Sequence, residues 1–280
     1  MKETSFNGLC QAAAAALCLC APPLKAGELA VVLSSKAGPY SEAYEAFAST
    51  LKLPAELLDA SPDGFEIPED IRYAAAFGAR AAALNYPPGT RLVYALAPVA
   101  PHGPGWHEIS MAPPPEAALE AYKTLQPGLK RLAVFWAAYP GERYIADLRK
   151  AGDKAGIEII SARLKNPESL PDRLRRLMGK MDAFWLLPDP ALITPSSIML
   201  LADFSCSNAI PFYAPTHALM LNGAAASFAP DFAQSGAAAA RVLAAMRGGA
   251  RVPSVTYPEN TVLRVNEALR GKCNWPLAKK

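Results

Sequence analysis

Short, continuous apolar runs alternate with segments of helical periodicity along most of the chain, and this alternation limits how the chain can fold. The runs Leu29–Leu33, Leu92–Leu96 and Leu132–Trp136 contain only apolar residues, which is typical of parallel strands that are covered on both faces. Segments of about a dozen residues with apolar positions at helical spacing, such as Tyr40–Leu51, lie between strands. Strands and helices in this order form parallel sheets through right-handed crossovers. The sequence therefore predicts an α/β protein.

The predicted elements fall into two groups that are separated near Pro127-Gly128. The predicted strands are Leu29–Leu33, Leu92–Leu96, His107–Met111, Leu132–Trp136, Ile157–Ser161, Ala183–Leu187, Pro211–Ala214 and Val262–Val265. The predicted helices are Tyr40–Leu51, Ile67–Leu84, Pro115–Leu125, Gly141–Ala155, Leu170–Met178, Pro195–Ser207, Asp231–Met246 and Asn266–Arg270. Two such groups predict two lobes. The first lobe comprises residues 27–128 and is completed by about 252–280, and the second comprises residues 129–251.

The first 26 residues have the composition of a secretory signal peptide. Lys2 supplies a positive charge, although Glu3 stands beside it, and Leu9–Ala21 is apolar apart from Gln11. A plausible cleavage site follows and ends at Ala26. At about 13 residues the apolar run is too short to span a bilayer, which takes about 20. We predict that residues 1–26 are removed on export to the periplasm; the alternative is a buried N-terminal helix.

The five cysteines bear on the compartment and on anchoring. Cys18 or Cys20 would be acylated if the chain were a lipoprotein, but a leucine precedes each of them where lipidation prefers a small residue. We therefore favour a simple cleaved signal. Cys206 and Cys273 remain in the mature chain, and in an oxidising compartment they can pair. Two buried free thiols are an equally open alternative.

The composition and motifs exclude several classes of function. The formal net charge is only +3, and the basic residues are dispersed, so the chain lacks the basic stripe of a nucleic-acid binder. No Gly-x-Ser-x-Gly elbow, His-Glu-x-x-His helix or phosphate-binding loop occurs. His102 and His107 lie in one loop but lack a third metal ligand. We predict no enzymatic activity, no metal and no cofactor.

The residues that follow the predicted strands are the candidates for ligand binding. In open α/β sheets the ligand crevice lies beyond the carboxyl ends of the strands. The candidates are Ser34, Ser35, Tyr40, Trp136, Tyr139, Asp189, Thr216 and His217. Aromatic surface with hydroxyls and one carboxylate suits a mostly apolar pocket in which a few polar groups fix the ligand's orientation. For any one of them, ordinary loop chemistry is an equally good explanation.

Several segments of the chain resemble one family. The resemblance lies in Trp106–Pro127 with the strand Leu132–Trp136 after it, in Asp182–Ile193 (DAFWLLPDPALI), in Asn208–Ala214 (NAIPFYA) and in Asp231–Met246. The family is that of the substrate-binding proteins of ABC transporters, in particular the small two-lobed group that includes TrpX-like proteins. The Trp-Leu-Leu-Pro-Asp-Pro block is the most specific part, and residues 27–105 match only loosely.

The resemblance implies a type I periplasmic-binding fold, in which two Rossmann-like lobes close about a hinge around a ligand. It places Ser34 and Ser35 on the wall of the first lobe. On the wall of the second lobe it places Trp136, Tyr139, Asp189, Thr216 and Asp231. It further implies a small-molecule ligand and, as partners, an inner-membrane permease and an ATPase. We expect a monomer.

The chain departs from the family pattern in ways that bear on the ligand. Thr216–Met220 stands where a glycine-rich stretch is usual, and Ala229–Phe232 stands where a polar turn is usual. The predicted cleft also offers no evident arginine for the carboxylate of an amino acid. We therefore expect an uncharged, partly apolar ligand, such as an aromatic compound or a sterol-type lipid. Two alternatives remain: a lipid shuttle that works without an importer, and an accessory or sensory protein.

Overall fold

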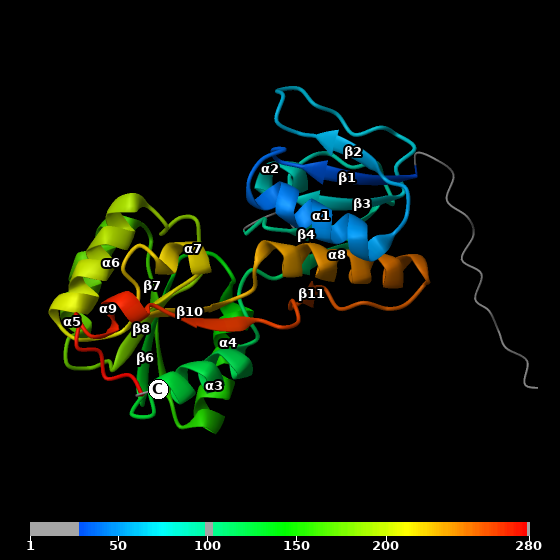
Figure 1. Cartoon of the computed structure of the whole chain (residues 1–280). Helices are drawn as coiled ribbons and strands as arrows, with labels where there is room; N and C mark the ends of the chain where they lie inside the picture. The colour runs from blue at the N-terminus through cyan, green and yellow to red at the C-terminus, as the bar shows by residue number, and fades with distance from the viewer. Residues whose placement is uncertain (1–27, 99–102, 279–280) are drawn as a thin grey trace, which may run out of the picture.

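A computed structural model describes residues 28–98 and 103–278 of the chain. The predicted signal peptide and His102 lie outside these residues. The described chain forms two lobes, each built on one six-stranded sheet with helices on its faces (Figure 1). The two mostly parallel sheets confirm the predicted α/β class.

The first sheet has the strand order β11-β5-β4-β3-β1-β2, and all neighbouring strands in it are parallel. Its strands are β1 (Leu29–Leu33), β2 (Glu56–Asp59), β3 (Tyr73–Phe77), β4 (Arg91–Ala95), β5 (Trp106–Ile109) and β11 (Val255–Thr256). Its helices are α1 (Pro39–Leu51), α2 (Ala79–Ala82) and α8 (Phe232–Arg247). All five residues of β1 are buried, because β1 lies in the interior of the sheet with side chains packed on both of its faces.

The second sheet has the order β12-β10-β9-β8-β6-β7, and only the pair β10–β12 is antiparallel. Its strands are β6 (Arg131–Trp136), β7 (Glu158–Arg163), β8 (Ala183–Leu186), β9 (Phe212–Ala214), β10 (Ala226–Ala229) and β12 (Val262–Val265). Its helices are α3 (Pro115–Leu125), α4 (Glu142–Ala155), η1 (Pro167–Ser169), α5 (Leu170–Leu177), α6 (Pro195–Ser207), α7 (His217–Met220) and α9 (Glu267–Arg270).

The predicted helix over Ile67–Leu84 is wrong. The structure forms strand β3 from the first part of this segment and the short helix α2 from the last part. Three consecutive alanines, Ala74 to Ala76, favour a helix by propensity, but here they are fully buried between β1 and β4. Backbone pairing on both sides and burial on both faces outweigh the local preference.

The lobe boundaries also differ from the predicted ones. Helix α3, assigned above to the first lobe, packs against α4 in the core of the second. Helix α8, assigned above to the second lobe, packs against α1 in the first. This packing is so close that a Cβ atom at Gly236 would overlap the backbone carbonyl of Ala43. The C-terminal segment divides, because β11 joins the first sheet and β12 joins the second.

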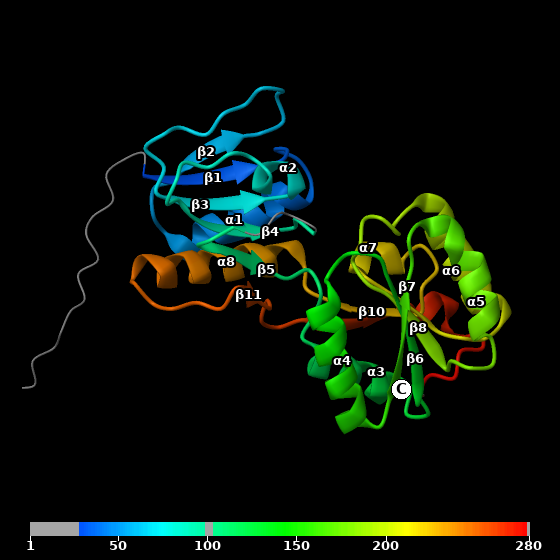
Figure 2. The ribbon, with the colours of Figure 1, turned by 180° about the vertical axis from the view of Figure 1, so that it is seen from behind.

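Three segments of the described chain therefore cross between the lobes: residues 110–114 between β5 and α3, 230–231 between β10 and α8, and 257–261 between β11 and β12. We call them the crossing segments. They lie together at the junction of the two lobes (Figure 2), which is the arrangement of a hinge.

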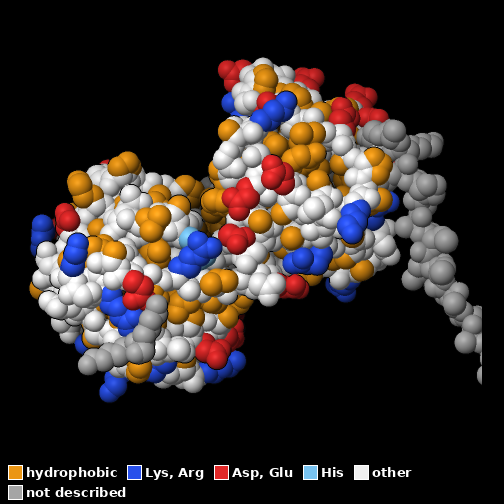
Figure 3. Space-filling model, viewed as in Figure 1, with side chains coloured by type: hydrophobic (Ala, Val, Ile, Leu, Met, Phe, Trp, Pro, Cys, Tyr) orange, Lys and Arg blue, Asp and Glu red, His pale blue; other side chains and the backbone are white. Residues whose placement is uncertain are grey.

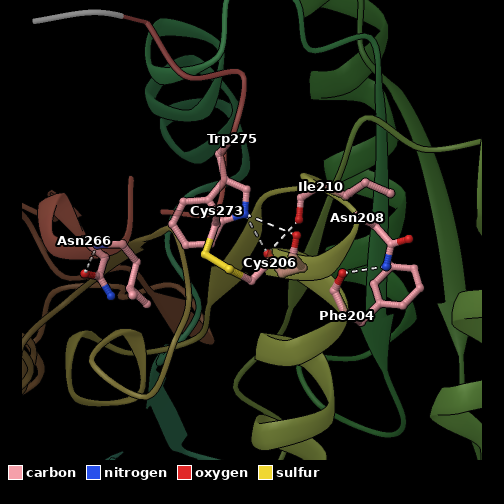
Figure 4. Close-up of a disulfide and its surroundings, with 9 residues drawn as sticks. Phe204, Cys206, Asn208, Ile210, Asn266, Cys273 and Trp275 are labelled. Carbon is pink, nitrogen blue, oxygen red and sulfur yellow. Dashed lines mark hydrogen bonds between the residues drawn. A yellow bond between two sulfur atoms is a disulfide. The ribbon is translucent and has the colours of Figure 1, made fainter. Parts of the chain in front are cut away.

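Cys206 and Cys273 form a disulfide. Of the two alternatives that remained open, a disulfide and two free thiols, the first is therefore correct. The bond joins the end of α6 to the C-terminal segment (Figure 4). Next to it, Nε1 of Trp275 donates a hydrogen bond to Oγ of Ser205 at 3.0 Å. The disulfide and Trp275 fix the end of the chain to the second lobe.

Candidate functional site

The carboxyl ends of strands from both lobes face each other across the crossing segments. Strands β1 and β3 end on the side of the first lobe that is turned toward the second lobe, and α7, which follows β9, lies opposite α2 (Figures 1 and 2). The space-filling view shows the molecule hollowed between the two lobes (Figure 3). We call this region the interlobe cleft, and it is where a ligand is expected in sheets of this kind.

Three predicted residues lie together on the first-lobe side of the interlobe cleft. Oγ of Ser34 accepts a hydrogen bond from the backbone N–H of Ala81 at 2.9 Å, in the first turn of α2. The ring of Tyr40 packs beside Ser34 on Gly78, where a Cβ atom would overlap both side chains. Oγ of Ser35 accepts a bond from the N–H of Ala37 at 3.3 Å. All three side chains are half-buried, so part of each is open to a ligand.

The carboxylate of Asp189 organises a loop of the second lobe instead of meeting a ligand. Its Oδ2 accepts hydrogen bonds from the backbone N–H groups of Ala137, Ala138 and Tyr139, at 2.8, 2.6 and 2.8 Å. Its Oδ1 accepts one from Ala191 at 3.0 Å. Asp189 is fully buried, with an exposed fraction of 0%. Four backbone donors therefore satisfy the charge, and none of it is presented to the cleft.

Trp136 is placed in the core and not on the cleft wall, which corrects the prediction. Its side chain is 1% exposed and belongs to the apolar cluster between β6 and α3. Nε1 of Trp136 donates to Oγ of Ser161 at 2.9 Å, and the guanidinium of Arg163 lies 4.9 Å from the ring centroid. Side chains alternate between the two faces of a strand, and Trp136, the last residue of β6, lies on the same face as Leu132 and Val134, in the cluster with α3.

Tyr139 joins the two lobes. Its hydroxyl donates to Oε1 of Glu108 on β5 at 2.7 Å and accepts from the backbone N–H of Met111 at 2.9 Å. Burial, and after it the negative charge of Glu108, raises the pKa of Tyr139 well above its usual range. The phenol therefore stays protonated and can donate. Tyr139 is 6% exposed, so it braces the hinge and offers little surface to a ligand.

Two of the remaining predicted residues are helix caps. Oγ1 of Thr216 accepts from the N–H of Leu219 at 3.2 Å and begins α7. The carboxylate of Asp231 accepts from the N–H of Gln234 at 2.7 Å and begins α8 with a capping box. Both residues are half-buried. They fix the helix ends that border the interlobe cleft.

His217 ties α7 to the strand that leads into a crossing segment. Its Nδ1 lies 2.7 Å from Oγ of the buried Ser227 on β10. Burial lowers the pKa of His217, and the positive charge of Arg264 lowers it further. The charge of Asp231 and a hydrogen bond with the backbone of Ala229 act in the opposite direction, without reversing the net shift. His217 is therefore neutral at pH 7.

We expect the protein to lose stability as the pH falls below about 6.5, and His217 to carry part of that loss. Because the pKa of His217 is lower in the folded protein, the unfolded chain binds more protons in this range, and protons then favour unfolding. Urea unfolding at pH 7.5 and at pH 5 measures the effect. The variant His217→Gln should show a smaller fall between the two pH values, and an equal fall in both proteins would contradict this assignment.

A second feature lies beside the crossing segments, a cavity of about 200 Å³ between β5, β11 and the first turns of α4. We call it the hinge cavity. Residues from both lobes line it: Glu108, Ser110, Pro140, Arg143, Tyr144, Asp147, Pro253, Ser254, Val255 and Tyr257. None of the nine predicted residues is among them. This cavity is not recognisable from local sequence patterns, because it forms only when residues 253–257 return to pair with β5.

A larger groove of about 570 Å³ lies on the second lobe between α6 and α7 and is lined by residues of that lobe alone.

Residues 28–98 and 103–278 contain neither a candidate metal site nor a helix that could span a membrane. No group of three or more His, Cys, Asp or Glu side chains there could hold a metal ion. None of the helices there is long and apolar enough to cross a membrane.

The similarity of the chain to known proteins defines its class. The sequence profile of the family described as ABC transporter substrate binding protein matches residues 109–266, which is more than half of the chain. The chain belongs to this family, whose members bind a small ligand for an ABC transporter and are not catalytic. No curated protein matches the chain.

Solved structures share the fold over nearly the whole length. The ligand-free, open structure of the substrate binding protein CD0873 from Clostridium difficile has a TM-score of 0.63 at 14% identity, covering 90% of this chain and 95% of that one. A conserved domain protein from Vibrio cholerae has a TM-score of 0.60 at 16% identity, covering 91% and 97%. An ABC domain from Streptococcus pneumoniae, solved in complex with L-Trp, has a TM-score of 0.59 at 14% identity, covering 89% and 96%. These likenesses establish the type I periplasmic-binding fold.

Proposed function

We propose that this chain is an exported solute-binding protein that captures a small, uncharged and partly apolar ligand in the interlobe cleft for an ABC-type uptake system. An inner-membrane permease and an ATPase would be its partners. One observation carries the proposal: the carboxyl ends of parallel strands in both sheets face each other across three crossing segments. A ligand held there contacts both lobes, and it stabilises the closed arrangement by its additional contacts in that state.

The charges at the predicted site support an uncharged ligand. The carboxylate of Asp189 is occupied by backbone donors, and His217 is neutral at pH 7. The half-buried carboxylate of Asp231 accepts a backbone N–H as a helix cap, and half-buried Ser35 and Tyr40 present hydroxyl and ring chemistry. An uncharged ligand fits such a surface, because it leaves no buried charge without a partner.

Export is supported by two independent features. Residues 1–26 have the composition of a signal peptide. The Cys206–Cys273 disulfide is of the kind that persists in oxidising compartments such as the periplasm. Together they favour a periplasmic protein.

A lipid or sterol-type shuttle that works without an importer is the second candidate. The groove between α6 and α7 favours it, because Ile193, Ile198, Met199 and Leu219 give it a mainly apolar lining. Neighbouring genes separate the two candidates. Permease and ATPase genes support uptake, and an efflux-type pump supports a shuttle.

Blocking the interlobe cleft from the first lobe tests the proposal. Native mass spectrometry and thermal-shift assays against aromatics, lipid extracts and amino acids would first identify a bound compound, which should raise the melting temperature. We expect Ser35→Trp to weaken its binding by about tenfold or more, because the indole occupies ligand space. The matched control Ser49→Trp, at an exposed position of α1, should bind normally. Equal binding by both variants would refute the cleft assignment.

A further inference from the structure

The hinge cavity has a chemistry that the proposed ligand does not use. We propose that it is a separate binding site for a small zwitterion, a molecule that carries one ammonium and one carboxylate group. The site lies between the lobes beside the crossing segments and is distinct in its residues from the strand-end candidates.

The wall formed by α4 supplies a site for the carboxylate. Arg143, in the first turn of α4, has no ion-pair partner among the described residues, so its guanidinium is free to form a bidentate pair with a carboxylate. The helix begins at Gly141, which makes no side-chain cap. The first N–H groups of α4 therefore add favourable positive potential for an anion at the same place.

The remaining walls supply acceptors for the ammonium. Asp147 lies one turn after Arg143 on the same face of α4. Among the described residues, its ion pair is with exposed Lys150 at 3.1 Å, a contact of little strength. Glu108, from β5, is 8% exposed and also lines the cavity, and it adds negative charge there although its Oε1 accepts the hydrogen bond from Tyr139. Charged groups of both signs thus line the cavity, so a zwitterion can pair its carboxylate with Arg143 and its ammonium with Asp147.

Tyr257, in a crossing segment, lies among these charged groups. Its hydroxyl makes no hydrogen bond to a described residue and is available to a ligand. Burial raises the pKa of Tyr257, and the charges of Asp147 and Glu108 raise it further, while Arg143 lowers it. Tyr257 lines the same cavity as these three charged side chains, so a ligand that meets them also meets the hydroxyl.

The size of the hinge cavity restricts the ligand. Its volume of about 200 Å³ is smaller than the range of roughly 300–1,000 Å³ that is typical of sites for drug-sized molecules. Glycine and β-alanine are of suitable size and charge. Because both lobes line the cavity, a molecule bound there also stabilises one relative orientation of the lobes, and it must affect binding in the interlobe cleft reciprocally.

Isothermal titration of the whole protein with glycine tests the proposal. Ethanolamine and glycolate are the comparison probes, because each keeps one of the two charged groups. We expect glycine to bind about tenfold or more tightly than either probe. Arg143→Gln and Asp147→Asn should each weaken glycine binding by a similar factor. The matched controls Arg149→Gln and Asp153→Asn, at exposed positions of the same helix, should bind glycine as the unmodified protein does.

Two outcomes would overturn the proposal: no heat of binding at millimolar glycine, or glycine binding that survives Arg143→Gln unchanged. The result is independent of the proposed function. The Ser35→Trp variant should no longer bind the cleft compound but should still bind glycine. The Arg143→Gln variant should no longer bind glycine but should still make the direct contacts with the compound in the interlobe cleft. Failure at one site is therefore distinguishable from failure at the other.

Discussion

Replacing Asp189 by alanine is expected to lower the free energy of unfolding by about 4 kcal/mol, because it removes a buried acceptor that four backbone N–H groups share. Oδ2 alone holds the N–H groups of Ala137, Ala138 and Tyr139. Without the carboxylate these donors stay buried without partners, or the loop opens to water. Urea unfolding at neutral pH measures the loss.

The loop that Asp189 holds also positions Tyr139 against Glu108, so the variant should weaken the brace between the lobes as well. Asp153→Ala, at an exposed position of α4, is the control and should change stability by less than about 0.5 kcal/mol. If Asp189→Ala costs no more than this control, the carboxylate does not organise the loop.

Loss of the disulfide is expected to lower the free energy of unfolding by about 4 kcal/mol, because the bond closes a loop of 67 residues. The cost arises chiefly because the unfolded chain regains the freedom that the cross-link removed. The double variant Cys206→Ser, Cys273→Ser should unfold at lower urea concentration than the unmodified protein. The change should be largest for the second lobe, to which the bond fixes the C-terminal segment.

A reducing agent provides the matched control for the disulfide. Dithiothreitol should destabilise the unmodified protein to about the level of the double variant and leave the double variant itself unchanged. A shift of the double variant on reduction, or no shift of the unmodified protein, would contradict the pairing of Cys206 with Cys273.

Much of the fold could be predicted from the sequence, for a physical reason. A strand that is covered on both faces must be apolar at every position, so Leu29–Leu33 and Leu132–Trp136 are recognisable without neighbours. The helices Pro115–Leu125 and Pro195–Ser207 match their predicted bounds, because a proline marks each start.

Elements determined by long-range packing were not predictable in the same way. The alanines of β3 become a strand only through pairing with β1 and β4. The place of α8 depends on Gly236, whose lack of a side chain lets α8 approach the backbone of α1 at Ala43. In an alanine-rich helix such a glycine gives no local signal of which lobe it will join.

The candidate site, like the fold, could be predicted from the sequence only in part. Sequence reasoning identified Asp189 and Tyr139 as special residues at strand ends, but the geometry shows that they organise the loop and the hinge. Trp136 was mistaken because the last residue of a strand can still point into the core. Arg143, which lines the hinge cavity, was not singled out because, in the sequence, it is one of several charges on an amphipathic helix.

A solute-binding protein of the proposed kind closes its two lobes on a ligand held between them. Spin labels at Ala37→Cys and Ala218→Cys, exposed positions on the two sides of the interlobe cleft, report the distance between the lobes. The mature protein, which lacks residues 1–26 and with them Cys10, Cys18 and Cys20, is used, and Cys206 and Cys273 are paired, so that only the introduced thiols are labelled.

The distance is measured by pulsed electron spin resonance before and after addition of the compound that native mass spectrometry finds bound. We expect the distance distribution to shift to shorter values with the compound, and the same compound to cause no shift when Ser35→Trp is also present. An unchanged distribution at a saturating concentration of the compound would contradict a lobe-closing solute-binding protein.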